Sequence, residues 1–221
     1  MRSAIDKKTW IPAATACVLW FLMFSPLTKD CFNFWLMMGT SAAMLLALTL
    51  SFDGKKMLKA LACRNIATQV FLGIAIAAAL WGIFWLGDKI SQLMFSFARS
   101  QVDDVYGMKS DISPRTVGML LLFLVGPAEE LLWRGFIKRR LFDCYSESKA
   151  NPGLWAMAVT TAAYTLIHIW SCNFMLIMAA LVAGTVWGAL YAIRPRWLPA
   201  LVLSHAIWMQ PYLSGFQYKT K

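Results

Sequence analysis

The sequence predicts an all-helical protein that crosses a membrane about seven times. Hydrophobic residues make up 59% of the 221 residues and charged residues 14%, against roughly 25% charged residues in a typical soluble domain. The apolar residues stand in continuous blocks instead of alternating with polar ones, which favours lipid around them. Because an open strand cannot satisfy its backbone in lipid, we expect a polytopic transmembrane helical bundle.

The apolar blocks give the order of the predicted spans. They are Trp10–Phe24, Cys31–Leu50, Ile66–Gly87, Thr116–Phe136, Gly153–Trp170, Phe174–Ile193 and Trp197–Leu213. The first block ends without a clear cleavage site, so we interpret it as the first span and not as a signal peptide. Two stretches between blocks, Lys55–Cys63 and Lys89–Ala98, are predicted to form short interfacial helices.

The basic residues indicate the orientation. The net charge is +10, which in a soluble chain would suggest nucleic acid. Here the bases gather before the first block and in the gaps after the second, fourth and sixth blocks: Arg2, Lys7 and Lys8; Lys55, Lys56, Lys59 and Arg64; Lys138, Arg139, Arg140 and Lys149; Arg194 and Arg196. Positive residues concentrate on the cytoplasmic side. We therefore expect a multi-pass protein with a cytoplasmic N-terminus and no nucleic-acid partner, although Lys219 and Lys221 fall on the opposite side.

The five cysteines (Cys17, Cys31, Cys63, Cys144 and Cys172) form no CxxC pair. An odd number without a regular spacing argues against a disulfide scaffold or a cysteine-based zinc site. Their role is predicted to be that of small buried side chains.

Five ionisable residues lie inside the apolar blocks and carry the functional prediction. They are Glu129, Glu130 and Arg134 in the fourth block, His168 in the fifth and His205 in the seventh. Charged side chains cost roughly 2.5–3.5 kcal/mol each at membrane depth, so such residues face one another or a water-filled cavity. Either they form a functional site, or they are a hydrogen-bonded network that only ties helices together.

Spacing separates the two glutamates. Glu130 and Arg134 stand four residues apart with the acid first, which favours an ion pair on one helix face. Glu129 is turned by about 100° from Glu130, so we expect it to point toward other helices, where it can act as a general base. Pro127 predicts a helix distortion just before the acids. Tyr164 lies one turn before His168 and either orients the imidazole or packs against it.

These residues resemble the motifs of the CPBP intramembrane proteases, which include type II CAAX prenyl proteases and bacteriocin-processing proteins. Glu129-Glu130-Leu131-Leu132-Trp133-Arg134, followed by Gly135-Phe136, looks like the first motif; Tyr164 and His168 match the second; Gly184–Arg196 and Ser204-His205-Ala206 resemble the last. The likeness spans about 115 to 209. It divides the chain into N-terminal helices (1–114), a catalytic core of four helices (115–213) and a tail (214–221), and it implies a bacterial inner membrane.

The resemblance implies an intramembrane endopeptidase that hydrolyses a membrane-embedded or lipidated peptide. Glu129 would activate a water that His168 helps to hold, His205 would stabilise the oxyanion, and Arg134 would position Glu129 and Glu130. The sequence departs from the family at Met209, where an Asn or Asp usually follows His205 by four. Gln210 is adjacent but rotated away, and it can take a supporting role only if the helix is distorted before Pro211. Methionine donates no hydrogen bond, so a catalytically weak or inactive protein that binds membrane peptides, as in bacteriocin self-immunity, is the alternative.

Two further alternatives remain open at this level. Glutamates and histidines can ligate zinc, but the two acids diverge on the helix and no HExxH pair is present, so water activation without a metal is favoured. A small transporter would also bury acids and histidines, but the chain lacks the paired interrupted segments of repeat-built transporters.

Overall fold

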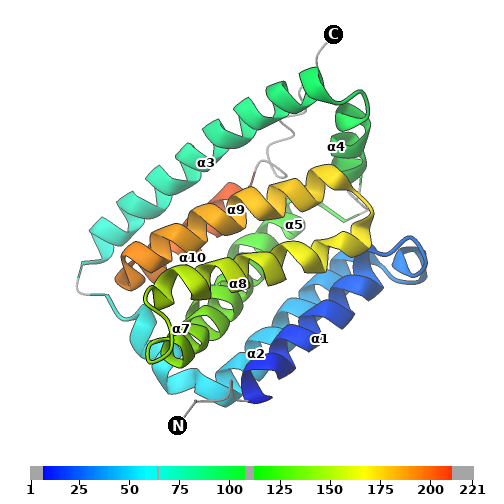
Figure 1. Cartoon of the computed structure of the whole chain (residues 1–221). Helices are drawn as coiled ribbons and strands as arrows, with labels where there is room; N and C mark the ends of the chain where they lie inside the picture. Colours follow the sequence, from blue (N-terminus) through cyan, green and yellow to red (C-terminus); the bar gives the residue numbers. More distant parts are fainter. Residues whose placement is uncertain (1–6, 64, 108–111, 211–221) are drawn as a thin grey trace.

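The computed structural model describes residues 7–63, 65–107 and 112–210, and all regular structure in these ranges is helical (Figure 1). The helices are α1 (Lys7–Phe24), α2 (Phe34–Leu61), α3 (Ile66–Met94), α4 (Ala98–Gly107), α5 (Pro114–Leu120), α6 (Gly126–Glu130), α7 (Arg139–Tyr145), α8 (Pro152–Leu166), α9 (Phe174–Ile193) and α10 (Leu198–Trp208). Short 3₁₀ turns η1 (Lys29–Cys31), η4 (Ile167–Ser171) and η5 (Pro195–Trp197) connect some of them. The predicted helical bundle is therefore confirmed.

The central helix runs without a break from Pro114 to Tyr145 and contains two π-helical segments, η2 (Leu121–Val125) and η3 (Leu131–Lys138). The first π-helical segment, η2, is a helix distortion at the position where Pro127 predicts one, just before the two acids. The Gly126 N–H reaches the Leu121 carbonyl, one residue further back than in an α-helix. Pro127, which follows, has no N–H to donate. A wide π turn accommodates this missing donor.

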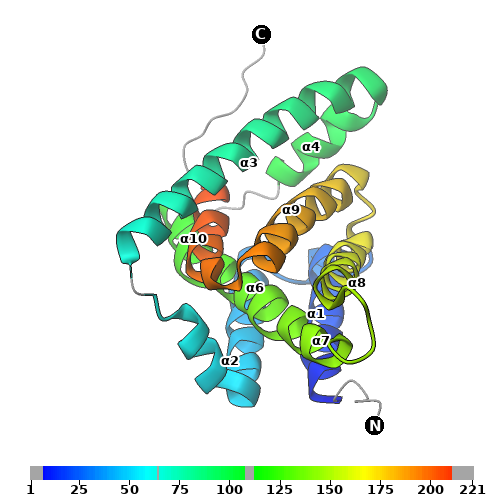
Figure 2. The same cartoon turned by 60° about the vertical axis from the view of Figure 1, so that its left-hand side comes forward.

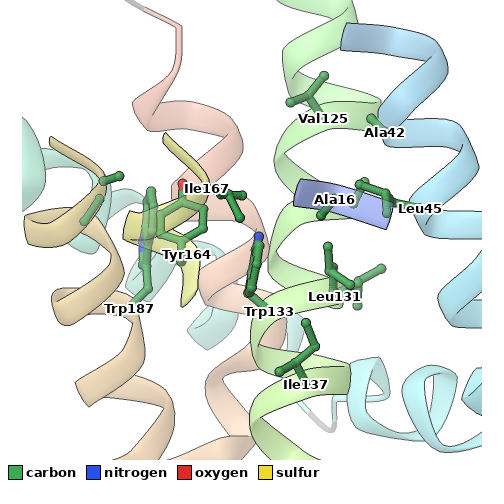
Figure 3. Packing of buried hydrophobic residues seen from close by; sticks show 14 of the residues in the cluster. Ala16, Ala42, Leu45, Val125, Leu131, Trp133, Ile137, Tyr164, Ile167 and Trp187 are labelled. Carbon is green, nitrogen blue, oxygen red and sulfur yellow. The ribbon is translucent and has the colours of Figure 1, made fainter. Parts of the chain in front are cut away.

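Helices α1, α2, α8 and α10 pack against this central helix (Figure 2). In its most apolar window, 61% of the residues are buried, against 17% in α3, which lies along one edge of the bundle (Figure 1). Figure 3 shows Val125, Leu131 and Ile137 of the central helix near residues of α1 and α2, such as Ala16 and Leu45. The acids at its middle are therefore held inside protein.

Each predicted apolar block contains a helix, but the lengths differ. Within the described residues, four helices are long and apolar enough to cross a membrane: Phe34–Leu61, Ile66–Met94, Pro114–Tyr145 and Phe174–Ile193; α1 is a shorter apolar helix. The number of seven spans stays a prediction. The end of the seventh block at Leu213 and the tail 214–221 lie outside the described residues.

Three segments differ from the prediction. Lys89–Ala98 is not one interfacial helix, because its first part continues α3 to Met94 and α4 begins at Ala98. Lys55–Leu61 is helical, as predicted, but it continues α2 beyond a kink at Asp53, and Cys63 lies past the end of the helix. Lys138 does not lie in a loop after the fourth block, because the π-helical turn carries the chain onward, and its side chain is 2% exposed.

Asp53 explains why the central helix and α2 stay together beyond the apolar blocks. Its carboxylate pairs with Arg139 and Arg140 of α7. The predicted basic gap is thus partly neutralised by an acid from a neighbouring helix. Such a partly buried pair favours one docking of α2 on the central helix.

Candidate active site

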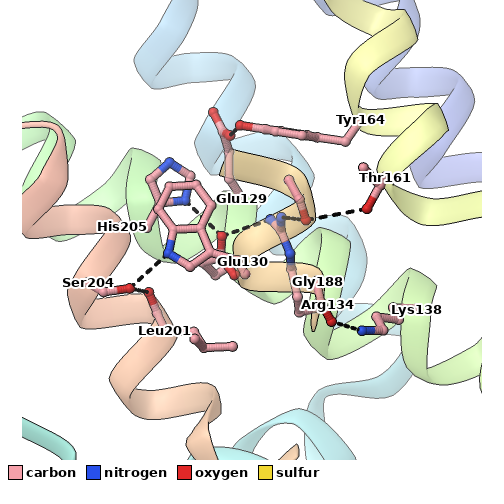
Figure 4. Close-up of polar contacts among 12 residues, drawn as sticks. Glu129, Glu130, Arg134, Lys138, Thr161, Tyr164, Gly188, Leu201, Ser204 and His205 are labelled. Carbon is pink, nitrogen blue, oxygen red and sulfur yellow. Dashed lines mark hydrogen bonds and ion pairs between the residues drawn. The ribbon is translucent and has the colours of Figure 1, made fainter. Parts of the chain in front are cut away.

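The five ionisable residues predicted to meet lie around one region of the bundle. Glu129 and Glu130 come from α6, Arg134 from η3, His168 from η4 and His205 from α10, and all five side chains are buried. Figure 4 shows the two acids, Arg134 and His205 converging from the central helix and α10. Four separate elements therefore supply one polar cluster.

Glu130 is the centre of this cluster. Its Oε1 accepts a hydrogen bond from Arg134 Nη1 at 2.8 Å and faces His205 Nδ1 at 2.9 Å. The Arg134 pair is the one that the spacing predicts. The contact to His205 is new, because sequence reasoning separated Glu130 from the reaction centre. An ionised carboxylate only accepts hydrogen bonds, so Nδ1 of His205 carries a proton and Nε2 is the nitrogen left for other partners.

Trp187 fixes the plane of His205. The two rings stack with centroids 4.0 Å apart and an interplanar angle of 22°. The Trp187 indole donates to Ser204 Oγ at 3.0 Å, and Ser204 in turn donates to the Leu201 carbonyl at 2.8 Å. Sequence reasoning missed Trp187, although it lies within the family-like stretch Gly184–Arg196.

Tyr164 joins Glu129 to His168. Its hydroxyl donates to Glu129 Oε2 at 3.1 Å, and its backbone carbonyl lies 2.7 Å from His168 Nδ1. Tyr164 lies one turn before His168 and so reaches back to the level of Glu129. Through Tyr164, His168 is therefore connected to Glu129 on the central helix.

A second tryptophan outside the predicted site also reaches it. Trp20 of α1 donates from Nε1 to His168 Nε2 at 3.3 Å, and both side chains are buried. No local pattern pointed to this contact, since Trp20 lies in an ordinary apolar block. Its helical spacing to Ala16 and Phe24, which are also buried, identifies only the inward face of α1.

Two glycines allow the helices to approach closely enough for these contacts. A Cβ added at Gly126 would lie 3.0 Å from the Ala206 Cα and N, so α6 and α10 meet backbone to backbone beside His205. A Cβ at Gly184 would lie 3.0 Å from the ring of Tyr164. Small residues serve this purpose generally in membrane bundles.

The backbone of α9 holds the buried cations of the central helix. The Gly184 carbonyl accepts from Arg134 Nη2 at 3.2 Å and from Thr161 Oγ1 at 3.3 Å. One turn later, the Gly188 carbonyl accepts from Lys138, whose amino group also lies 5.1 Å from the centre of the Tyr191 ring. Lys138 is therefore a buried basic residue that sequence reasoning placed in a loop.

Glu129, His168 and His205 all line one cavity of about 120 Å³. Its wall is otherwise mainly apolar, with Trp20, Phe24, Phe34, Trp35 and Met38 from the first two helices and Leu176, Ala179, Ala180 and Ala183 from α9. A volume of this size exceeds the minimum of roughly 10–15 Å³ that one water requires. The geometry therefore brings a carboxylate and two imidazoles to one cavity with room for several waters.

Met209 also lines this cavity, whereas Gln210 turns elsewhere. The Gln210 amide donates to the Ala206 carbonyl at 2.8 Å and to the Gly118 carbonyl at 3.4 Å. The supporting role considered for Gln210 is thus not what this arrangement shows. Met209, four residues after His205, is therefore the residue of this pair that lines the cavity.

Many polar atoms of the site already have hydrogen-bond partners within the protein, and these bonds reduce the number of atoms that could bind a metal ion. His168 uses both ring nitrogens, and His205 uses Nδ1 for Glu130. In residues 7–63, 65–107 and 112–210, no three His, Cys, Asp or Glu side chains are grouped as metal ligands. Water activation without a metal, which the sequence favours, stays a prediction.

Comparison with known proteins agrees with the motifs. Residues 112–209 match the family model described as type II CAAX prenyl endopeptidase Rce1-like. No curated protein and no solved structure shows significant similarity to the chain. The matched range contains all five clustered ionisable residues together with Tyr164 and Trp187. This match supports the resemblance of the motifs to the CPBP intramembrane proteases, with residues 112–209 as the Rce1-like region of the chain.

Proposed function

We propose that the protein is an intramembrane endopeptidase that hydrolyses a membrane-embedded or lipidated peptide with a water activated by Glu129. One observation carries the proposal: Glu129, His168 and His205, from three separate elements, line one cavity enclosed by apolar side chains. A general base and an oxyanion donor are sufficient for hydrolysis without a covalent nucleophile.

Glu129 is the proposed base. Its Oε2 is held by the Tyr164 hydroxyl, which leaves Oε1 for a water in the cavity. The water gives a proton to Glu129 as its oxygen attacks the peptide carbonyl carbon. The proton then passes from Glu129 to the leaving amine as the C–N bond breaks, so the enzyme returns to its starting state.

His205 is the proposed oxyanion donor. With Nδ1–H bound to Glu130, the doubly protonated, cationic form of the imidazole donates from Nε2 to the negative oxygen of the tetrahedral intermediate, and the Glu130 carboxylate balances its charge. Arg134 holds the Glu130 carboxylate, and Trp187 holds the imidazole plane. The Glu130–His205 contact thus has the orienting role that a carboxylate has in a hydrolase triad.

The substrate class follows from the wall of the cavity. Aromatic and aliphatic side chains surround the three polar groups, so the peptide segment that enters must leave water for an apolar site. A segment in the bilayer, or one tethered to it by a lipid, is already at that depth. We propose that it enters from the cytoplasmic side of a bacterial inner membrane, with the N-terminus of the protein on the same side.

Cleavage of a lipidated or membrane-tethered peptide by the purified full chain in lipid nanodiscs tests the proposal. Glu129→Gln keeps the shape of the side chain but removes the base, and we expect the rate to fall by about 100- to 10,000-fold. Glu147→Gln is the matched control, because Glu147 lies exposed beyond α7, and it should keep the wild-type rate. Equal cleavage by wild type and Glu129→Gln would refute the proposed mechanism.

Met209 supports a second candidate function, a family member that binds membrane peptides without cleaving them. The residue lines the cavity with a side chain that has no hydrogen-bond donor. In this case wild type and Glu129→Gln bind the peptide equally and neither releases product. Product release by the wild type alone would exclude this candidate.

A further inference from the structure

We propose that Trp20 of α1 is a positioning residue for the reaction centre: its indole N–H holds His168 with Nε2 ready to accept a hydrogen bond from the attacking water. The inference rests on the proposed function, in which His168 helps to hold that water. Trp20 lies far outside the matched residues 112–209. The first helix would therefore belong to the catalytic unit.

The contact joins two buried polar groups. Trp20 Nε1 lies 3.3 Å from His168 Nε2, and the rings meet edge to face with centroids 6.2 Å apart and an interplanar angle of 76°. Trp20 is 2% exposed and His168 is 7% exposed. Buried indole N–H groups commonly have a hydrogen-bond acceptor, and His168 supplies one to Trp20 across 148 residues of sequence.

The partners of His168 require one protonation pattern. The Tyr164 carbonyl, 2.7 Å from Nδ1, can only accept a hydrogen bond, so Nδ1 carries a proton. The Trp20 indole can only donate, so Nε2 must carry a lone pair. Together they select the neutral Nδ1–H tautomer and disfavour a proton on Nε2.

This pattern suits the proposed reaction. A water between Glu129 and His168 needs an acceptor for each of its two hydrogens, and a protonated Nε2 could not serve. The indole bond of 3.3 Å is longer than the usual 2.7–3.2 Å range, so a water can compete for the same lone pair. Trp20 thus keeps Nε2 an acceptor until water and substrate arrive, while Tyr164 links the same ring to the base through its hydroxyl.

Nitrogen NMR of the full chain in nanodiscs, labelled with ¹⁵N-histidine, tests the contact without any substrate. The chain has two histidines, so His168→Gln assigns the spectrum. We expect Nδ1 of His168 to be protonated and Nε2 to be unprotonated in the wild type. Trp20→Phe keeps an aromatic ring but removes the donor, and it should shift the Nε2 resonance.

Trp81→Phe is the matched control for this spectrum, because its indole donates to the Trp208 carbonyl at 3.1 Å on the edge of the bundle. It should leave the His168 resonances in place. A wild-type His168 protonated on Nε2 would overturn the proposal, even if the Trp20 variant did not fold. An Nε2 resonance that is the same in wild type and Trp20→Phe would also overturn it.

Kinetics supply the second test. Loss of a partner that orients a site residue typically costs about 10- to 100-fold in activity, so Trp20→Phe should lower kcat by that factor while KM changes little and Trp81→Phe keeps the wild-type kcat. An unchanged or higher kcat would refute a positioning role. If Glu129→Gln cleaves as fast as wild type, the proposed function fails instead, and the nitrogen spectrum still decides the Trp20 contact.

Discussion

Gly126 sets the distance between the helix that carries the two acids and the helix that carries His205. In Gly126→Ala the new Cβ would lie 3.0 Å from both the Cα and N of Ala206, so a backbone must move by a few tenths of an ångström. Overpacking of this kind costs about 1–3 kcal/mol. The residue after His205 is the one displaced, and a 1 Å misplacement in an active site costs about 100-fold, so we expect roughly a tenfold loss of kcat.

Gly82→Ala provides the matched control, because a Cβ added at Gly82 of α3 has nothing within 4 Å. Both variants gain up to about 1 kcal/mol of helix propensity, and this gain cancels in the comparison. The unfolding free energy of Gly126→Ala should therefore lie about 1–3 kcal/mol below that of Gly82→Ala. It is measured by reversible denaturant unfolding in mixed micelles, alongside the cleavage rate. Equal stability and equal kcat in the two variants would refute the close approach of α6 and α10.

Four further substitutions test the site, with Lys138→Met as the comparison for Arg134→Met. Arg134→Met should lower the unfolding free energy by about 3–5 kcal/mol, because it leaves a buried Glu130 carboxylate without its cation. Lys138→Met should lower it less, by about 1.5–3 kcal/mol, because it removes a hydrogen bond between a charged group and a carbonyl but leaves no buried charge without a partner. Tyr164→Phe removes a hydrogen bond to a carboxylate, which is worth about 1.5–3 kcal/mol, and should lower kcat about 10- to 100-fold. Met209→Asn adds a donor beside the cavity and should raise kcat by up to about 100-fold.

Each of these has a result that contradicts it. Equal unfolding free energies for Arg134→Met and Lys138→Met would mean that the Glu130 pair contributes little. A Tyr164→Phe protein with wild-type kcat would remove the hydroxyl from the positioning of Glu129. A Met209→Asn protein that is no faster than wild type, but equally stable, would show that the oxyanion site is complete without an amide.

The sequence predicted the parts of the site whose geometry is local. The apolar blocks predicted the helices, because lipid leaves the backbone no partner outside its own helix. The Glu130–Arg134 pair follows from four-residue spacing on one helix. The distortion before the acids follows from Pro127, since proline cannot donate to the preceding turn.

Local periodicity failed where a contact depends on how far a helix continues. Lys138 was assigned to a loop because the apolar block ends at Phe136. A π-helical segment instead carries the chain on, and the Gly188 carbonyl receives the Lys138 amino group. A basic residue therefore indicates the end of a membrane helix only when no neighbouring helix provides a buried hydrogen-bond acceptor for it.

By itself, the sequence determined a helical membrane protein with two acids, an arginine and two histidines inside its apolar segments. The tertiary structure alone decided which atoms meet: His205 with Glu130 across 75 residues and Trp20 with His168 across 148. Such pairs depend on the distance and angle between packed helices, which close contacts at Gly126 and Gly184 set. The spacing of residues along one helix does not determine these distances, because they depend on how the side chains of neighbouring helices pack.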